Sequence, residues 1–269
     1  MVDLEMLQDK PHRNVVRIGD TVRRPLQPWS ASVHELLLHL EKIGFPYAPR
    51  VLGVDEEGRE VLTYVEGESG ADGWAKVVDE RGLAAMARLL RDYHDAVRDF
   101  RPVAAAGWAG GAASDSASDG LVCHGDFGPW NLVWHGLEPV SIIDWDYAWP
   151  ARPMHDVAYA LEYVAPFRDD ATCLQWLAYP SPPDRRRRAE VFAEAYGLSG
   201  LDGPGGSGLD GSALVDEVIG QQEAVWERAR RLAAQGMQPQ AEWQESGFLD
   251  RTAERIRWSR DNRDLFAPV

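Results

Sequence analysis

The N-terminal quarter of the chain alternates short apolar runs with turn signals, which predicts two β-hairpins separated by one helix. The runs NVVRIG and TVRRP flank a Gly-Asp turn, and RVLGVDEEGREVLTYVEG turns at DEEGR. Between them, residues 30–44 repeat apolar side chains at helical spacing, and Ser32 and Glu35 fit a capping box. The predicted apolar face comprises Val33, Leu36, Leu37, Leu40 and Ile43.

From residue 79 onward the apolar spacing is mainly helical. Helices are predicted near MHDVAYALEYV, DRRRRAEVFAEAYG, ALVDEVIGQQEAVWERARRLAAQ and AEWQESGFLDRTAERIRWSRD. Gly-, Ala- and Ser-rich composition predicts a surface loop at 104–120 and a linker at 197–211. The RRRR run at 185–188 could be taken for a nucleic-acid patch, but its acidic surroundings favour a solvated helix face.

Residues 121–150 interrupt this pattern, because they read as buried strand yet carry Asp126, Asn131 and Asp144. NLVWH and VSIID flank GLEP, which predicts a hairpin in which Asn131 lies opposite Asp144. The sequence FGPW between Asp126 and Asn131 favours a tight loop that turns Asp126 back to the same place.

A shared chemical purpose explains these three polar side chains. Carboxylate and amide oxygens are the ligands that hard divalent cations such as magnesium prefer. We therefore expect two of the three to hold a metal ion and one to act on a proton nearby. Another hypothesis is a metal-dependent hydrolase, which would use His124, Asp126, His135, Asp144 and Asp146. The spacing of these residues fits no zinc-binding pattern.

Composition limits the class of protein. The 269 residues are enough for one large domain or for two lobes around a cleft, and at 45% hydrophobic they can bury a sizeable core. The 28 basic and 43 acidic residues give a net charge of −15. This charge disfavours nucleic acid and anionic membranes as partners and favours a cationic small molecule. With neither a signal peptide nor an apolar span, and only two cysteines, a cytoplasmic protein is expected.

The segments HGDFGPWN, IIDWD and HDVAYAL together resemble the aminoglycoside phosphotransferase and choline kinase-like family. The order H-x-D-x-x-x-x-N followed by a strand ending in Asp is also similar to the protein-kinase catalytic loop and its metal-binding Asp. The resemblance covers most of the chain and is strongest over 121–162. It implies an α+β, two-lobed protein-kinase-like fold, with a small β-rich N-lobe at 1–66 and a larger, mainly helical C-lobe at 67–269.

The resemblance also implies roles for individual residues. Asp126 is expected to accept or orient the proton of the substrate hydroxyl, while Asn131 and Asp144 hold magnesium against the phosphates of ATP or GTP. His124 is expected to brace the loop through a backbone hydrogen bond, and Asp146 to support the metal ligands or touch the substrate.

The N-lobe departs from the kinase pattern in two ways. No lysine is available to hold the phosphates, so we expect Arg24 to do so, with Glu35, or His34 if the helix register differs by one, as its partner. The glycine-rich phosphate loop is also absent. LTYVEG resembles the lobe-connecting hinge, in which Thr63 and Val65 are the candidates for holding the purine.

The leading hypothesis is a magnesium-dependent kinase that phosphorylates a hydroxyl of a small cationic molecule, such as an aminoglycoside-like antibiotic or an amino-alcohol. The alternative is a non-catalytic binding or immunity protein, because the N-lobe looks like the trifolitoxin-immunity-type branch of the family. The family lines its aminoglycoside pocket with carboxylates, and the candidates here are Glu162, Asp169, Asp170, Glu217, Glu223, Glu227, Glu242 and Glu245.

Overall fold

The computed structural model describes residues 4–10, 13–102, 107–109, 120–198, 211–238 and 240–266. Most of the predicted loop 104–120 and linker 197–211 lies outside these residues. The chain divides into two compact units: unit 1 comprises Met1–Gly73 and Leu89–Pro153, and unit 2 comprises Trp74–Arg88 and Met154–Val269. The predicted lobe boundary after residue 66 stays a prediction, but the segment Leu89–Pro153 clusters with the N-terminal sheet.

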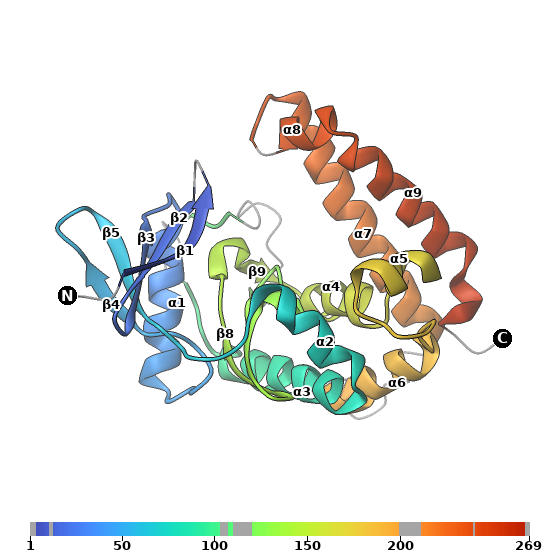
Figure 1. Ribbon diagram of the computed structural model, residues 1–269, viewed down its shortest axis with the longest axis horizontal. Helices are drawn as coiled ribbons and strands as arrows, with labels where there is room; N and C mark the ends of the chain where they lie inside the picture. Colours follow the sequence, from blue (N-terminus) through green and yellow to red (C-terminus); the bar gives the residue numbers. More distant parts are fainter. Residues whose placement is uncertain are drawn as a thin grey trace. The chain divides into compact units, whose positions relative to one another are not determined.

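Unit 1 contains a five-stranded antiparallel sheet in the order β1-β2-β3-β5-β4 (Figure 1). Both predicted hairpins are present, as β2–β3 and β4–β5, whereas β1 was not predicted. The apolar residues of β1 are exposed, Leu4 at 62% and Met6 at 48%. The alternation of buried apolar and exposed polar residues that marks a half-buried strand is therefore weak in β1. The strand bounds are Leu4–Lys10, Arg13–Ile18, Thr21–Pro25, Val51–Val54 and Arg59–Thr63 for β1 to β5.

The pairing of β3 with β5 sets up the candidate site. These strands are not consecutive in the chain, and their register places Arg24 directly opposite Glu60. Directly opposed residues project their side chains to the same face, so the guanidinium and the carboxylate meet. Arg23 points to the other face and pairs with Asp55 at 3.3 Å.

The helix between the two hairpins is α1, Ser30–Lys42. Four of its predicted apolar residues are buried, but Ile43 lies beyond the last turn and is 49% exposed. The predicted capping box was wrong, because the helix begins two residues before Ser32, with Trp29 at the N-cap and no side-chain cap bond. Ser32 instead lies inside the helix, where it is buried and its hydroxyl donates to the carbonyl of Gly107.

Two short pairs of strands complete unit 1. β6 (Leu121–Cys123) pairs with β9 (Trp149–Ala151), and β7 (Leu132–His135) pairs with β8 (Glu138–Ile142). The helix α3, Glu80–Ala96, contributes Tyr93, whose hydroxyl donates to the carbonyl of Val122 at 2.6 Å. Trp134 and Trp145 are fully buried, so the motif segment is anchored in the core of this unit.

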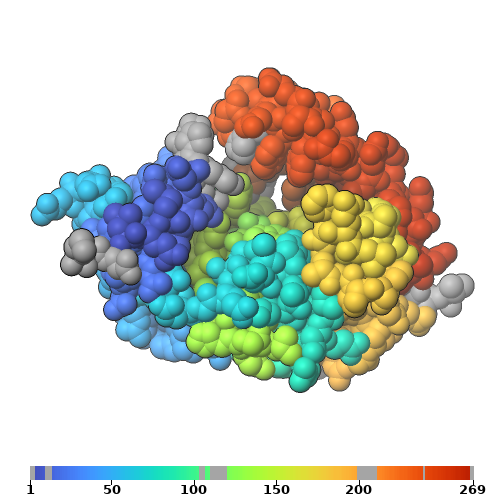
Figure 2. All heavy atoms as spheres, viewed as in Figure 1, coloured from blue at the N-terminus to red at the C-terminus, as the bar shows by residue number. Residues whose placement is uncertain are grey.

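Unit 2 is mainly helical. Helices α7 and α9 lie side by side, and α8 contacts both of them (Figure 1). Their atoms are the orange and red ones in Figure 2. Helix α4 packs against α6 and α7. The helices, with α2 beginning at the end of unit 1, are α2 Gly73–Val78, α4 Met154–Val164, α5 Asp170–Trp176, α6 Arg185–Tyr196, α7 Gly211–Ala234, α8 Gln240–Glu245 and α9 Phe248–Asp261.

The prediction of a solvated face for the RRRR run was wrong for two of its four residues. Arg185 and Arg188 are each 5% exposed, one helical turn apart on the inner face of α6. Arg185 donates to the carbonyls of Pro166 and Arg168, and Arg188 to that of Val164. The arginines therefore satisfy carbonyls at and after the C-terminal end of α4, a tertiary role that local composition does not reveal.

The chain's two cysteines, Cys123 and Cys173, are buried free thiols, consistent with the predicted lack of a disulfide framework. Within the part of the chain that the structure describes, none of the helices combines the length and the apolar character that crossing a bilayer requires.

Candidate active site

The β7–β8 hairpin is tighter than predicted, and this changes the neighbour of Asn131. The strands are joined by two residues, beginning with Gly136 at φ +61°, and a register shift follows Val133. Leu132 pairs with Ile142, so the residue next to Asn131 is Ile143, whose N–H donates to the Asn131 carbonyl at 2.9 Å. The predicted pairing of Asn131 with Asp144 was therefore wrong by one residue.

Asp144 lies just beyond this last rung, in the left-handed region at φ +61° and ψ +64°. A non-glycine residue there costs on the order of 1 kcal/mol, although Asp tolerates it better than most. The conformation ends the strand and starts the short 3₁₀ turn Trp145–Tyr147, which is anchored by a hydrogen bond from Trp145 Nε1 to the Ile142 carbonyl. The Asp144 side chain remains 22% exposed, so its carboxylate is accessible.

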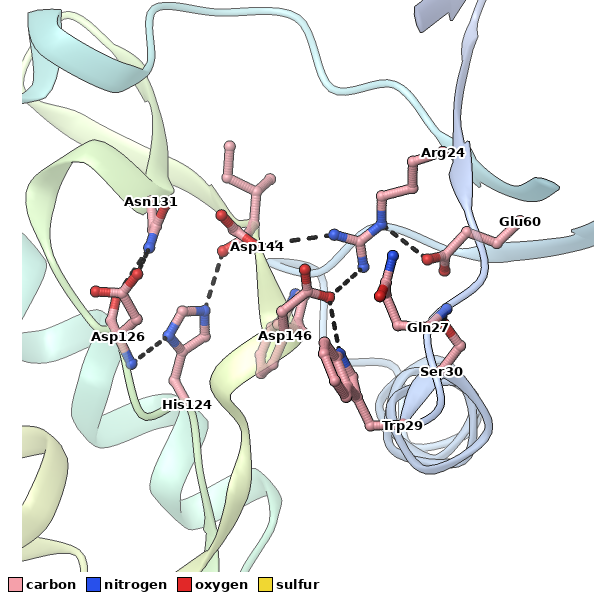
Figure 3. A network of polar contacts seen from close by, with 12 residues as sticks. Arg24, Gln27, Trp29, Ser30, Glu60, His124, Asp126, Asn131, Asp144 and Asp146 are labelled. Carbon is pink, nitrogen blue, oxygen red and sulfur yellow. Dashed lines mark hydrogen bonds and ion pairs between the residues drawn. The ribbon is translucent and has the colours of Figure 1, made fainter. Parts of the chain in front are cut away.

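Asp126 and Asn131 are joined directly. Asn131 Nδ2 donates to both the carbonyl and the Oδ2 of Asp126, each at 2.9 Å (Figure 3). The loop is tight as predicted, because the Gly128 N–H donates to the Asp126 carbonyl at 2.8 Å. Among the contacts described for Asn131, its Nδ2 makes both side-chain bonds, which leaves Oδ1 as the atom of this amide that can coordinate a cation.

Gly125 permits this loop to approach the turn that follows Asp144. It has φ +80°, and a Cβ built there would lie 2.1 Å from the Tyr147 carbonyl oxygen. Any side chain at this position would push apart the loop that carries Asp126 and the turn that carries Asp146. The HGD sequence is thus a steric requirement of the site as well as a chemical one.

His124 holds the same two segments together, as predicted. The Asp126 N–H donates to His124 Nδ1 at 3.3 Å, and the other ring nitrogen, Nε2, lies 3.0 Å from the Ile143 carbonyl. Since Nδ1 is the acceptor, Nε2 carries the proton and donates, which fixes the tautomer of the neutral ring. The ring is fully buried, with edge contacts to Phe127 and Trp145.

Arg24 reaches this site from β3 and faces three carboxylates. Its Nε donates to Glu60 at 2.8 Å, its Nη2 lies 3.0 Å from Asp146 Oδ1, and its Nη1 lies 3.8 Å from Asp144 Oδ1 (Figure 3). Arg24 and Asp146 are each 11% exposed and Glu60 is 0% exposed, so these pairs are largely shielded from water. Three carboxylates thus face one guanidinium, and this surplus of negative charge favours a cation.

Asp146 also receives the indole N–H of Trp29 at 3.3 Å. Trp29 is the residue that starts α1, so the sheet, the helix and the motif segment all meet at this carboxylate. Asp146 thus lies between Arg24 and Trp29. Its role, supporting the metal ligands or touching the substrate, stays a prediction.

The structure pairs Arg24 with Glu60 where the sequence predicted Glu35. The side chain of α1 that reaches the same carboxylate is His34, whose Nε2 lies 2.8 Å from Glu60 Oε2. The predicted alternative, His34, is therefore the α1 side chain that lies at this place, although it contacts Glu60 and not Arg24. A cofactor-binding role for Glu35, which is partly buried on α1, stays a prediction.

Sequence reasoning missed Glu60, and also Trp29, because the signal is not local. Glu60 meets Arg24 only through the pairing of β3 with β5, two strands separated by a helix and a strand. Once that register is known, a buried carboxylate opposite the arginine is an expected partner.

Thr63 and Val65, the predicted purine contacts, lie at the end of β5 and just after it. The Thr63 N–H donates to the Arg50 carbonyl at 3.0 Å, and its hydroxyl accepts from the Arg50 N–H at 2.9 Å. These bonds fix the backbone at the exit of the sheet. The contact of Thr63 and Val65 with a nucleotide stays a prediction.

The residues fit a divalent cation. The Asp144 carboxylate and the Asn131 amide oxygen are hard oxygen ligands on adjacent ends of one hairpin, and the surrounding charge is negative. The loosest contact of Arg24 is the one to Asp144, so this carboxylate is the least committed of the three that face the guanidinium.

Comparison with known proteins agrees with this arrangement. The model of the phosphotransferase enzyme family matches residues 108–191, which include the whole motif segment. The chain is 35% identical over 189 residues to the trifolitoxin immunity protein of Rhizobium leguminosarum bv. trifolii, covering 69% of this chain and 70% of that protein.

Solved structures with the same fold cover nearly the whole chain. The complex of gentamicin with APH(2")-IIa has a TM-score of 0.57 at 11% identity, covering 98% of this chain and 93% of that chain. A choline/ethanolamine kinase family protein from Mesorhizobium loti has a TM-score of 0.56 at 14% identity, covering 97% and 93%. At such low identity the likeness establishes the fold alone, and it confirms the predicted two-lobed α+β, kinase-like class.

Proposed function

Since the chain belongs to the aminoglycoside phosphotransferase and choline kinase-like family, we propose that it moves the γ-phosphoryl group of ATP or GTP to a hydroxyl of a small cationic molecule. The observation that carries this proposal is that Asp126 and Asn131 meet at the end of the hairpin from which Asp144 follows, and that Asp144 faces Arg24. Phosphoryl transfer depends on positioning and charge neutralisation, and these residues supply both.

Asp126 acts on the acceptor hydroxyl in this proposal. Its Oδ2 is held by Asn131, and its backbone N–H by His124, so the carboxylate has a fixed orientation. A carboxylate held in this way accepts a hydrogen bond from the hydroxyl and takes up its proton as the new bond to phosphorus forms.

Asn131 and Asp144 would hold the magnesium ion through Oδ1 and the carboxylate. The bound ion would supply neutralisation of the phosphate oxygens as charge moves during transfer. The left-handed backbone of Asp144 turns its carboxylate away from the β-ladder, and the His124 bond to Ile143 keeps the preceding residue in place.

Arg24 takes the role of the phosphate-binding lysine in this proposal. Glu60 fixes its Nε, which orients the guanidinium plane, and the 3.8 Å contact of Nη1 with Asp144 is the one that a phosphate oxygen can replace. A planar guanidinium can bind two phosphate oxygens through a fixed pair of parallel donors, whereas a lysine ammonium acts as a point charge.

The acceptor is proposed from charge and family alone. The predicted pocket carboxylates are partly committed in the structure: Glu162 lies near Arg168 and Arg255, Asp169 caps α5, Asp170 pairs with Arg185, and Glu223 pairs with Arg260. The other candidates for contact with a cationic acceptor are Glu217, Glu227, Glu242 and Glu245.

A phosphorylation screen tests the proposal. Purified protein is incubated with magnesium and ATP or GTP against a panel of aminoglycosides, choline and other amino-alcohols, and phosphorylated products are detected by mass spectrometry. Asp126→Asn is expected to lower the rate by roughly 10²–10⁴-fold with the fold intact. Glu138→Gln, an exposed carboxylate on β8 of the same hairpin, is the matched control and should retain the wild-type rate. An Asp126→Asn variant as active as wild type would refute the assigned role.

A second candidate is a non-catalytic binding or immunity protein on the same fold. Its support is the likeness to the trifolitoxin immunity protein, together with the absence of a lysine from β3 and of a glycine-rich loop before it. The same screen separates the two proposals. Absence of product from every acceptor, with no nucleotide hydrolysis above the Asp126→Asn background, would favour the binding protein.

A further inference from the structure

Unit 2 contains a cluster of charged side chains that the proposed phosphoryl transfer does not use. Glu162 near the end of α4 lies between two arginines: Arg255 on α9, with Nε 3.2 Å from Glu162 Oε1, and Arg168 before α5, with Nη2 3.7 Å from the same oxygen. The side chains of Glu162 and Arg168 are 6% and 10% exposed, and that of Arg255 is 25% exposed. We call these three residues the arginine cluster.

Several polar atoms of this cluster lack a hydrogen bond. Within the described residues, Arg168 Nε and Nη2, Arg255 Nε and Glu162 Oε1 are buried without a hydrogen-bond partner. A buried charged donor left unpaired destabilises the fold, and such groups are rare in folded proteins. Helix α7, which packs against both α4 and α9, adds Gln222, 2% exposed, whose two amide atoms are also unpaired.

The geometry differs from that of a structural clamp. Elsewhere in the same unit, Arg185 holds carbonyl and carboxylate oxygens at 2.6–3.0 Å. In unit 1, Arg24 holds Glu60 at 2.8 Å. In the arginine cluster neither contact is a hydrogen bond: Arg168 Nη2 is too far from Glu162 at 3.7 Å, and Arg255 Nε, although 3.2 Å away, is poorly directed at the oxygen. The guanidinium donors are therefore not directed at Glu162.

The charge of the cluster is unbalanced. Two guanidinium groups face one carboxylate, so one positive charge is left over. Burial, followed by the positive charge of Arg255, lowers the pKa of Arg168. The adjacent aromatic ring of Tyr163, with the Arg168 guanidinium 4.8 Å from its centroid, supplies only a weak cation–π contact.

We propose that the arginine cluster is a binding site for the carboxylate group of a small molecule. A carboxylate carries the single negative charge that balances the cluster, and its two oxygens match the parallel donors of a guanidinium. Arg255, the most exposed member, forms the entrance, and Arg168 forms the buried end. The proposal concerns unit 2 alone and goes beyond the proposed phosphoryl transfer, since it requires neither nucleotide nor metal.

Acetate is the probe that tests this site in the full-length protein without nucleotide. Saturation-transfer NMR measures acetate binding directly, and the melting temperature is followed in sodium acetate and in sodium chloride of equal ionic strength. At ten times its Kd, acetate is expected to raise the Tm by about 3 °C above the value in chloride. Arg255→Gln should raise the acetate Kd at least tenfold, since it removes one charge-assisted donor group.

Two further variants make the test specific. Arg260→Gln removes an exposed arginine of the same helix, which pairs with Glu223, and should leave the Kd of acetate within twofold of wild type. Glu162→Gln removes the competing carboxylate, so acetate should bind about tenfold more tightly and raise the Tm more than in wild type. A purely structural clamp predicts the opposite, a destabilised protein that acetate does not rescue.

The proposal is overturned if wild type shows no acetate signal beyond that in chloride, or if Arg260→Gln weakens binding as much as Arg255→Gln. It is also overturned if inorganic phosphate binds the wild-type protein more tightly than acetate, because the site is then not selective for a single charge. If Arg255→Gln does not fold, Arg255→Lys replaces it, because lysine keeps the charge but lacks the planar pair of donors. An acetate Kd of Arg255→Lys equal to that of wild type would count against the site. Phosphoryl transfer is measured separately, so either proposal can fail alone.

Discussion

Replacing Arg24 by glutamine tests the network that joins the N-terminal sheet to the motif segment. The change removes the guanidinium from between Glu60, Asp146 and Asp144 and leaves a shorter, uncharged polar side chain. Glu60 is 0% exposed, so its carboxylate would be buried with only His34 as a partner. The contact would thus change from a charge pair to a single hydrogen bond.

The magnitude follows from burial. Breaking a buried pair by removing one partner costs about 3–5 kcal/mol. We expect the low end, about 3 kcal/mol, because His34 still holds Glu60 and because Asp144 can be solvated at 22% exposure. Arg23→Gln, at the neighbouring residue on the opposite face of β3, is the matched control and should cost clearly less, since Arg23 is 29% exposed.

Urea denaturation of wild type, Arg24→Gln, Glu60→Gln and the double variant measures the effect as a cycle. If the two side chains act as one buried pair, the double variant should be less destabilised than the sum of the single variants, by about 2 kcal/mol. Additive effects, or an Arg24→Gln variant no less stable than Arg23→Gln, would refute the argument that Glu60 fixes the arginine.

Two other predictions concern separate parts of the molecule. Gly125→Ala is expected to lower the free energy of unfolding by several kcal/mol and to abolish transfer, because the new methyl group would overlap the Tyr147 carbonyl. Gly19→Ala, at a position with φ +58° and open space around it, should cost about 1 kcal/mol. Equal losses of stability in a denaturation experiment would contradict this. Burial raises the pKa of Tyr179 to about 12 from 10.0, so its neutral form stabilises the fold below pH 10 and this contribution is lost as the pH rises towards 12. The free energy of unfolding, measured against pH, should therefore fall more steeply above pH 10 in wild type than in Tyr179→Phe. Phenolate absorbance showing that Tyr179 ionises near pH 10 would rule this out.

Elements with strong local patterns could be predicted from the sequence. The β2–β3 and β4–β5 hairpins carry Gly-containing turns, and α1 repeats its apolar residues at the helical period, so each was recognised. Strand β1 was missed because its apolar side chains are exposed. The start of α1 was misplaced by two residues because Ser32 and Glu35 mimic a capping box inside the helix.

The candidate site was predictable only as far as it depends on neighbouring residues. The approach of Asp126 to Asn131 follows from the tight FGPW loop, whereas the hairpin register depended on a two-residue loop and a bulge that the sequence does not mark. The Arg24–Glu60 pair and the buried Arg185 and Arg188 arise from tertiary packing. Propensity and spacing carry no information about partners that distant segments supply.

Calorimetric titration of nucleotide, with magnesium and with a chelator, tests most directly whether Asn131 and Asp144 hold a metal-bound nucleotide. The account predicts saturable binding of ATP or GTP that needs magnesium and weakens at least tenfold in Asp144→Asn, while Glu138→Gln binds as wild type does. Absence of binding at millimolar nucleotide, or the same affinity in Asp144→Asn as in wild type, would contradict it.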